Sequence, residues 1–307
     1  MMPKISAVIV ITENPPYALK AIQSINPFVN EIIVGAVRTN NQLLSVIKKN
    51  PKARIVQLPP DVPYADIVKE DLKKMAKNDY VLFIDPDEII PPKTWKVIEN
   101  NINRFDSFHF PRKNIIFGKW IQNSRWWPDY QLRFFKKDTV NWPRQIHPIP
   151  KATGKEYKIP SEEQLAITHY NYSNLDEYFE KAIRYAKSEA LVYIQSNTQL
   201  QLTDTVRKAL TEFVSRFFAN EGYRDGMHGF VLAILQLFYY CLVQMYYWEY
   251  KKYPDEKLEV LVNSVSQFFQ TGTVESNHWI NKKYLVNPLA RFKMKLINRV
   301  IRLFGRT

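Results

Sequence analysis

Three carboxylates follow directly after one short apolar run in this sequence. Asp85, Asp87 and Glu88 come after Tyr80 to Ile84, whose β-branched and aromatic residues predict a strand buried on both faces. Ligands of open α/β sheets bind at the carboxyl ends of strands, and carboxylates crowded there repel one another unless a cation neutralises them. A hard ion such as Mg²⁺ or Mn²⁺, shared with substrate phosphates, fits Asp85 and Asp87 as ligands. The alternative is a solvated acidic turn around Pro86.

A fourth carboxylate, Asp129, stands just after a Trp-Trp-Pro sequence. This apolar setting predicts partial desolvation, which raises the pKa of a carboxyl group toward the working range of a general base. In the alternative interpretation Asp129 pairs with Arg133 or Arg125. Trp126 and Trp127 are either core residues or a platform on which a sugar ring stacks.

The elements that must position these residues alternate along the first hundred residues. Strand-like and helix-like patterns follow one another, which predicts a parallel sheet covered by helices on both faces. The expected strands are Ile5 to Ile11, Glu31 to Val34, Arg54 to Leu58 and Tyr80 to Ile84, and the helices between them are Pro16 to Ile25, Asn41 to Lys49 and Ala65 to Lys77. Neither a Gly-x-Gly-x-x-Gly sequence nor a P-loop occurs, so neither a dinucleotide-binding fold nor a P-loop ATPase is expected.

Composition narrows the class of partner. The chain has 307 residues, 46% of them hydrophobic, and a formal charge of +13, so we expect a real core and a polyanionic partner. Nucleic acid, anionic lipid and phosphorylated substrates all fit that charge, but no nucleic-acid motif is present and nucleic acid is disfavoured. One cysteine, Cys241, excludes an internal disulfide and a Cys-rich zinc site. Ile5 to Thr12 is too short an apolar run for an export signal.

The second half of the sequence is helical and ends in a basic tail. Helices are expected at Leu175 to Gln195 and Leu202 to Asn220. Gly229 to Trp248 carries no charge and is long enough to cross a bilayer, which takes about 20 residues, but its glutamines and tyrosines favour a buried or interfacial helix. From Ser276 onward all charges are basic, and apolar residues recur at helical spacing. This amphipathic pattern favours an anionic membrane surface over a partner groove.

Several motifs together resemble one enzyme family. They are Thr12-Glu-Asn14, Asp85-Pro-Asp-Glu88, Phe110-Pro-Arg112, Trp127-Pro-Asp-Tyr-Gln-Leu-Arg-Phe-Phe135, His147, His169-Tyr170 and Gly222-Tyr-Arg-Asp-Gly-Met-His-Gly229. In this order they are similar to bacterial glycosyltransferase family 2, and more narrowly to its lipopolysaccharide-core glucosyltransferase branch. The resemblance implies a GT-A fold, a nucleotide-sugar donor, a divalent metal at the Asp-x-Asp and inversion at the anomeric carbon.

The resemblance also assigns roles to individual residues. It implies Asp85 and Asp87 as ligands of Mg²⁺ or Mn²⁺, with His147 completing the metal shell or positioning the diphosphate; as lone histidines, His147 and His169 are otherwise interpreted as core residues. The remaining assignments place Asp129, then Glu88, as base, Arg112 and Arg133 as cationic helpers, and Thr12, Glu13, Asn14, Asn40 and Asp85 at the donor.

Two departures from the family pattern affect this site. Val34 to Asn41 lacks the usual nucleotide-binding aspartate, and the candidates to substitute for it are Asn40, Asn41 and the Thr12 to Asn14 segment. Pro148 stands where a glutamate is expected after His147. The first departure leaves the identity of the donor's nucleobase open, although a UDP-sugar is the favoured donor.

The sequence thus predicts a GT-A domain at 1–172, a helical region at 173–275 and a basic amphipathic tail at 276–307. The expected function is metal-dependent transfer of a sugar to a lipid-linked or cell-surface glycan at the cytoplasmic face of the cell membrane. A polyprenyl-phosphate sugar synthase and a catalytically silent sugar-binding protein remain as alternatives.

Overall fold

The structure, a computed structural model, describes residues 3–62, 64–144, 150–283 and 285–304. It divides into two compact units, each with its own core. Unit 1 comprises Met1–Ile115 and Trp127–Asn171, and unit 2 comprises Ile116–Trp126 and Tyr172–Thr307. The sequence-based prediction placed 116–126 in the first domain, whereas in the structure this segment belongs with the C-terminal helices.

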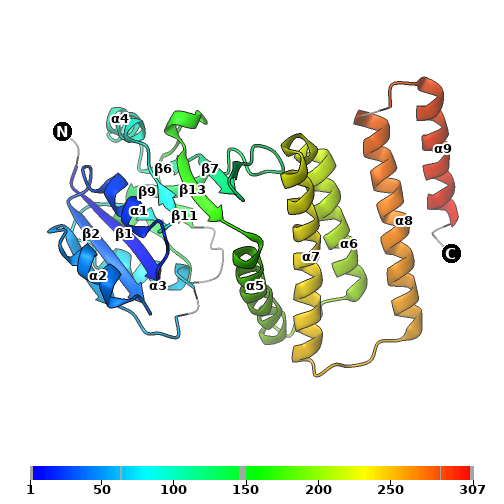
Figure 1. The fold of residues 1–307 in the computed structure, drawn as a ribbon, viewed down its shortest axis with the longest axis horizontal. Helices are drawn as coiled ribbons and strands as arrows, with labels where there is room; N and C mark the ends of the chain where they lie inside the picture. The colour runs from blue at the N-terminus through cyan, green and yellow to red at the C-terminus, as the bar shows by residue number, and fades with distance from the viewer. Residues whose placement is uncertain (1–2, 63, 145–149, 284, 305–307) are drawn as a thin grey trace. The chain divides into compact units, whose positions relative to one another are not determined.

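Unit 1 is a mixed α/β domain around a seven-stranded sheet (Figure 1). Four parallel strands, in the order β4-β1-β2-β3, form its centre, and the antiparallel β9 continues it toward β6 and β12. The strands are β1 (Ile5–Thr12), β2 (Glu31–Val37), β3 (Ala53–Gln57), β4 (Tyr80–Ile84), β6 (Ser107–Phe110), β9 (Gln131–Lys136) and β12 (Glu156–Lys158), and the helices that connect the first four are α1 (Ala18–Ile25), α2 (Asn41–Lys48) and α3 (Asp66–Lys74). The predicted alternation of strand and helix is confirmed, with boundaries shifted by up to three residues.

The core of unit 1 lies on both faces of the central strands. Every residue of β4 is buried, as the continuous apolar pattern predicted, and Val8 of β1 faces Phe83 of β4 in the register. Gly35 in β2 lets helix α3 approach closely, because a Cβ there would meet a methyl of Leu72 at 2.7 Å. This packing fixes α3, and with it Lys69, against the sheet.

A second, smaller sheet lies beside the end of β4. Its first three strands are β5 (Glu88–Ile89), β13 (Ile167–Tyr172) and β7 (Arg112–Ile116), in that order, the fourth is β8 (Lys119–Trp120), and His169 is opposite Glu88 in the ladder. Helix α4 (Pro92–Asn101) follows β5 and was absent from the sequence-based prediction, although Pro92 at its first position is a known start signal. Two short strands, β10 (Val140–Asn141) and β11 (Lys151–Ala152), pair with each other.

Unit 2 is a row of helices preceded by the short strand β8 (Lys119–Trp120). The helices are α5 (Leu175–Gln195), α6 (Leu202–Val214), α7 (Met227–Tyr250), α8 (Leu258–Lys283) and α9 (Pro288–Phe304). They lie side by side in the order α5-α7-α6-α8-α9 (Figure 1). Helix α6 ends at Val214 in a π-turn instead of continuing to Asn220, and α8 was not predicted at all, because its apolar pattern is weak.

The Gly222 to Gly229 motif has a structural role in unit 2. A Cβ at Gly229 would lie 1.8 Å from the carbonyl oxygen of Gly222, so only glycine allows α7 to begin there. The buried carboxylate of Asp225 accepts the backbone N–H groups of Gln122 and Asn123 at 3.3 and 2.9 Å. The motif therefore ties the 116–126 segment to the start of α7.

Helix α7 is the one helix, among those described, that is long and apolar enough to cross a membrane by length and composition. Only 28% of its most apolar window is buried. Its exposed apolar residues share one face of the helix: Phe230, Ile234, Phe238, Met245 and Trp248. A core helix of a soluble domain would bury such a stripe. Here these side chains remain 38% to 53% exposed, although Phe230, Phe238 and Trp248 each contact a neighbouring aromatic ring.

Candidate functional site

The candidate site lies at the carboxyl edge of the central sheet of unit 1. Strand β1 has β2 on one side and β4 on the other, so the chain leaves the sheet in opposite directions at this point. Such a switch point opens a crevice in α/β sheets, and ligands bind there. Thr12 ends β1 and Asp85 follows β4, so the predicted donor and metal residues flank the crevice.

Asp85 is held by two cations of the protein. Its carboxylate oxygens accept from Lys69 Nζ at 3.0 Å and from Arg133, which comes from the neighbouring strand β9. Burial alone would raise the pKa of Asp85, but Arg133 and Lys69 outweigh burial and hold it well below the usual range. The same pairing raises the pKa of Lys69 despite its burial. Asp85 is therefore ionised, and both of its oxygens are engaged.

Glu88 and Arg133 form the buried base of the site. Glu88 has no exposed surface, accepts from Arg133 at 2.6 Å and receives the backbone N–H of Asp85 at 3.1 Å. The two carboxylates raise the pKa of Arg133 against the effect of burial, and its Nε has no hydrogen-bond partner in the described part of the chain. A fully buried Glu88 orients Arg133 and does not reach a substrate, so the structure gives no support to Glu88 as second choice of base.

Asp129 has a different environment from the one its sequence predicted. Arg112 donates to Asp129 Oδ2 from Nε at 2.8 Å and from Nη2 at 2.6 Å. Asn114 and Gln131 each donate a further hydrogen bond at 3.0 Å. Burial favours a raised pKa, but Arg112 and these donors outweigh it and the pKa of Asp129 is lowered. The expectation of a raised pKa was wrong, because Arg112 is brought to Asp129 by the fold.

Neither pairing proposed for Asp129 as an alternative is formed. Arg133 faces Asp85 and Glu88, and Arg125, in unit 2, pairs with Glu212 at 2.5 Å. Trp126 belongs to the same unit and packs partly buried in its apolar core with Arg216 over its ring.

The ring of His169 is oriented so that its Nε2 atom faces Asp87. Asn114 donates its amide N–H to Asp129, so its carbonyl oxygen is the atom that meets His169 Nδ1 at 2.6 Å. An amide oxygen only accepts, and therefore Nδ1 carries the proton. The other nitrogen, Nε2, lies 3.6 Å from Asp87 Oδ2. In the neutral imidazole this nitrogen has a lone pair that can coordinate a metal ion. His169 Nε2 and Asp87 Oδ2 are therefore two potential metal ligands.

Asp87 and His169 are a pair of side chains that could hold a divalent ion. They present one oxygen and one nitrogen 3.6 Å apart, and the oxygens of Asp85 accept from Lys69 and Arg133. Within the described residues no group of three or more His, Cys, Asp and Glu side chains could hold a metal. Two protein ligands suffice where substrate phosphates complete the shell, and a nitrogen ligand favours Mn²⁺ over the oxygen-seeking Mg²⁺.

The other side of the crevice contains the predicted donor residues after β1 and β2. Asn14 Oδ1 accepts from the backbone N–H of Asn40 at 3.3 Å, and Asn40 Oδ1 caps α2 by accepting from Leu43 at 2.9 Å. Glu13 adopts a left-handed backbone conformation, with φ of 60°, and pairs with Arg38 at 3.5 Å. The structure brings these segments together, as expected for neighbouring parallel strands.

Some functional candidates were missed and others cannot be placed. Sequence reasoning overlooked Asn114 and Lys69, and interpreted His169 as a core residue. The only sequence signal for His169 was its place in a motif, because pairing of β13 with β5 is a long-range event. His147 and Pro148 lie outside the described residues.

No family model matches the chain. Among solved structures it is similar to S. aureus TarS 1-349 in complex with UDP-GlcNAc, at 14% identity and a TM-score of 0.44, over 99% of this chain and 91% of that one. The complex of TarS 1-349 with UDP gives 15% identity and a TM-score of 0.43, with the same coverage. A longer TarS structure matches 80% of this chain but only 54% of its own length, at 12% identity. Similarity at this level establishes neither a family nor an activity.

Proposed function

We propose that the chain is a metal-dependent, inverting glycosyltransferase that uses a nucleotide-sugar donor, with a UDP-sugar favoured. The carrying observation is the composition of the crevice in unit 1. Asp87 follows β4 and faces His169 of β13. Arg112 and Arg133 pair with the carboxylates of Asp129, Asp85 and Glu88, and amide side chains stand after β1 and β2. This layout separates an anion-binding half from a hydrogen-bonding half, as a nucleoside diphosphate requires.

The first set of residues acts on the leaving group, which is the nucleoside diphosphate of the donor. Asp87 and His169 would hold Mn²⁺ or Mg²⁺, which supplies positive charge to the departing diphosphate. Arg112 is the more accessible of the two arginines, because it is 16% exposed whereas Arg133 is 4% exposed, and it contacts both Asp129 and, at 3.5 Å, Glu88. Arg133 is fixed by two carboxylates, so its role is to hold Asp85 and the turn in place. A GT-A fold for unit 1 is part of this proposal.

Asp129 is the proposed base for the acceptor hydroxyl, and Arg112 controls its strength. While Arg112 is bonded to it, Asp129 is a weak proton acceptor. Diphosphate oxygens compete for the same guanidinium, because bidentate binding of phosphate is typical of arginine. We infer that donor binding draws Arg112 away and makes Asp129 more basic. The ion pair also favours a second candidate, a silent nucleotide-sugar binding protein, if Arg112 never leaves.

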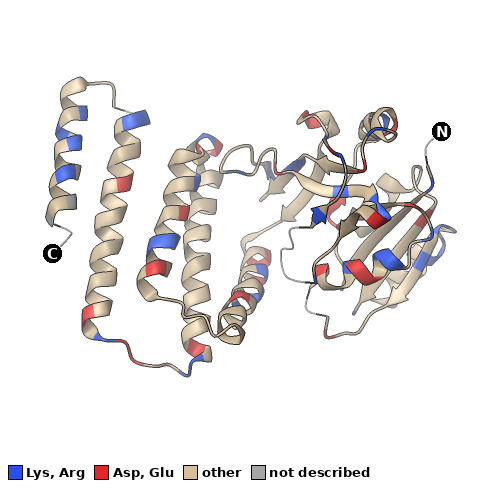
Figure 2. Ribbon diagram, turned by 180° about the vertical axis from the view of Figure 1, so that it is seen from behind, with Lys and Arg blue, Asp and Glu red and all other residues tan. Residues whose placement is uncertain are grey.

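The acceptor is proposed to be a lipid-linked or cell-surface glycan at the cytoplasmic face of the cell membrane. Support comes from unit 2, where α7 exposes an apolar stripe and α9 exposes Leu289, Phe292, Leu296, Val300 and Leu303 between 44% and 64%. Figure 2 shows Lys and Arg, but no Asp or Glu, along α9. A helix with one apolar and one basic side suits the headgroup layer of an anionic bilayer.

One series of measurements tests the proposal. Nucleotides and nucleotide sugars are screened for a rise in melting temperature with Mn²⁺, with chelator as control, since a ligand of the folded state stabilises it. The hit is then assayed for transfer. Metal-dependent stabilisation with turnover supports a transferase, and turnover on a bare polyprenyl phosphate identifies a synthase. Stabilisation without turnover identifies the silent binding protein, and no stabilisation by any nucleotide contradicts the proposal.

A further inference from the structure

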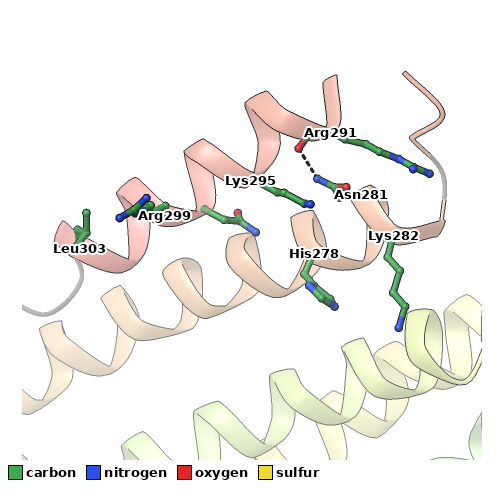
Figure 3. Close-up of a pocket in the computed structure, with 8 residues that line it drawn as sticks. His278, Asn281, Lys282, Arg291, Lys295, Arg299 and Leu303 are labelled. Atoms are coloured by element: carbon green, nitrogen blue, oxygen red, sulfur yellow. Dashed lines mark hydrogen bonds between the residues drawn. The ribbon is translucent and has the colours of Figure 1, made fainter. Parts of the chain in front are cut away.

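A basic cavity of about 660 Å³ lies between α8 and α9 in unit 2 (Figure 3). Its lining includes four cationic side chains and one imidazole, contributed by both helices: Lys282 and His278 from α8, and Arg291, Lys295 and Arg299 from α9. Leu303 lines the same cavity near the end of α9. The cavity therefore combines several positive charges with one apolar side chain.

The positive charge of this cavity is not balanced locally. No carboxylate lines it, and the sequence contains no Asp or Glu from Ser276 to the end. Lys283, next in sequence to Lys282, is paired with Glu221 at 2.5 Å, but among the described residues no such carboxylate meets Lys282, Lys295 or Arg299. Like charges gathered in one place repel each other, and an anion between them removes that repulsion.

Amide hydrogen bonds fix the two walls relative to each other. Asn281, which is buried, donates to the carbonyl oxygen of Arg291 at 2.7 Å (Figure 3). Asn277 donates to Asn298 Oδ1 at 3.0 Å, and Asn298 donates to the carbonyl of Val274 at 3.0 Å. Three polar contacts at successive turns hold the helical hairpin in register. Because these contacts fix the two helices relative to each other, the cations that line the cavity are held as a group.

The surface beside the cavity is apolar. On α9, Leu296 and Val300 are 53% and 44% exposed and lie on the same side as Leu303. The half-buried residues of this helix lie elsewhere on its circumference: Ala290, Met294, Asn298 and Ile301. The exposed apolar stripe thus meets the basic cavity at Leu303.

We propose that this cavity binds the phosphate headgroup of an anionic phospholipid, whose acyl chains lie along the exposed stripe of α9. Lys295, Arg299 and Lys282 donate charge-assisted hydrogen bonds to phosphate oxygens, and the apolar stripe contacts the chains. The inference rests on the membrane-associated part of the proposed function and deepens it. A general attraction to anionic surfaces acts on all lysines of α9, whereas a binding site acts on those that line it.

The chain offers a matched pair of variants. Lys295→Gln removes a charge from the cavity, and Lys293→Gln removes the same charge from the same helix two residues away, outside the cavity lining. Binding is measured by flotation of phosphatidylcholine vesicles with or without phosphatidic acid. We expect Lys295→Gln to weaken phosphatidic-acid-dependent binding by on the order of tenfold and Lys293→Gln by on the order of twofold, since only the former loses a direct phosphate contact.

Three outcomes would overturn the inference. Equal losses for the two variants would mean that attraction is diffuse. Release of the wild-type chain from vesicles by inorganic phosphate, but not by chloride of equal ionic strength, would identify free phosphate as the ligand. Absence of vesicle binding in the wild-type chain removes the membrane part of the proposed function as well. Melting temperature, with and without donor and Mn²⁺, is measured for each variant, so that loss of the fold or of the donor site is seen separately.

Discussion

The charged side chains of the two units have opposite environments. In unit 1 the charged groups of the crevice are paired with each other, as Lys69 and Arg133 are with Asp85. In unit 2 the basic side chains between α8 and α9 lack carboxylate neighbours in the cavity lining, and apolar side chains beside them are exposed. Paired charges create a preorganised site, whereas unbalanced charges and exposed apolar surface call for a partner that is external to the chain.

The same comparison separates two carboxylates that the sequence treated alike. Asp85 is a structural member of a buried charge network, while Asp87 stands beside the Nε2 of His169. Pro86 places the two side chains in different surroundings although they are two residues apart. Metal binding should therefore require the side chain of Asp87 directly, whereas Asp85 should affect it only by stabilising the fold.

The largest expected effect comes from Asp87→Ala. We expect loss of Mn²⁺-dependent donor stabilisation and a fall in turnover of about 10²-fold or more, because a developing charge on the diphosphate loses its stabilisation. Thermal unfolding should change little. Asp85→Ala is the matched comparison: it leaves Lys69 with Asp66 alone and Arg133 with Glu88 alone, and the loss of these two ion pairs should lower stability by about 2 kcal/mol. Full metal-dependent activity in Asp87→Ala would remove the metal assignment.

Asp129→Asn should reduce turnover by roughly 10²-fold, since an amide cannot accept the proton. Donor affinity should be retained or increased, because the loss of the carboxylate releases Arg112 for the diphosphate. Its effect on stability depends on pH. The lowered pKa of Asp129 means that the carboxylate stabilises the folded state above its unfolded pKa, about 3.9, and that this contribution is lost as pH falls through the lowered value. The wild-type chain should thus exceed the variant in stability at neutral pH and lose that advantage in acid.

Near-normal turnover of Asp129→Asn would show that another group accepts the proton. A stability difference that grows as pH falls would contradict the ion pair with Arg112.

Asn114→Leu tests the orientation of His169 and should have a smaller effect. Without the amide oxygen the proton on Nδ1 is no longer fixed, and Mn²⁺ affinity should fall by about 10-fold to 100-fold. Gln131→Leu is the control, because Gln131 also donates to Asp129 but does not reach His169 in the observed contacts. The ¹⁵N shifts of labelled histidine report the tautomer directly. An unchanged tautomer in Asn114→Leu would show that β-strand pairing alone orients the ring.

Truncation after Lys283 should have the smallest effect on unit 1. Removing α9 exposes part of α8, but the apolar stripe of α9 is already exposed, so we expect a folded chain with normal donor binding. Sedimentation with liposomes of anionic lipid should be lost, and activity should fall more on a membrane-embedded acceptor than on a soluble one. Retained sedimentation would move the anchor to α7. An unfolded product would show that α9 is part of the core of unit 2.

The local residue pattern predicted much of the fold of unit 1, because its parallel strands are continuous apolar runs between amphipathic helices. Helix α8 was not predicted because its apolar residues form no strong stripe, and α4 was missed although Pro92 marks its start. The sequence could place Asp85, Asp87 and Asp129 near strand ends. It could not give their charge partners, since Arg112, Arg133 and Lys69 reach them from other elements.

By itself the sequence determined the α/β class, the order of the first four strands and helices, the basic charge and the amphipathic pattern of the last helix, because these depend on periodicity and composition along a short stretch of chain. Tertiary structure alone decided that the pKa of Asp129 is lowered, that Asp85 is occupied by protein cations and that His169 faces Asp87. Those outcomes depend on which side chains meet across separate strands, and electrostatic interactions between them are set by distance in space and not by separation in sequence.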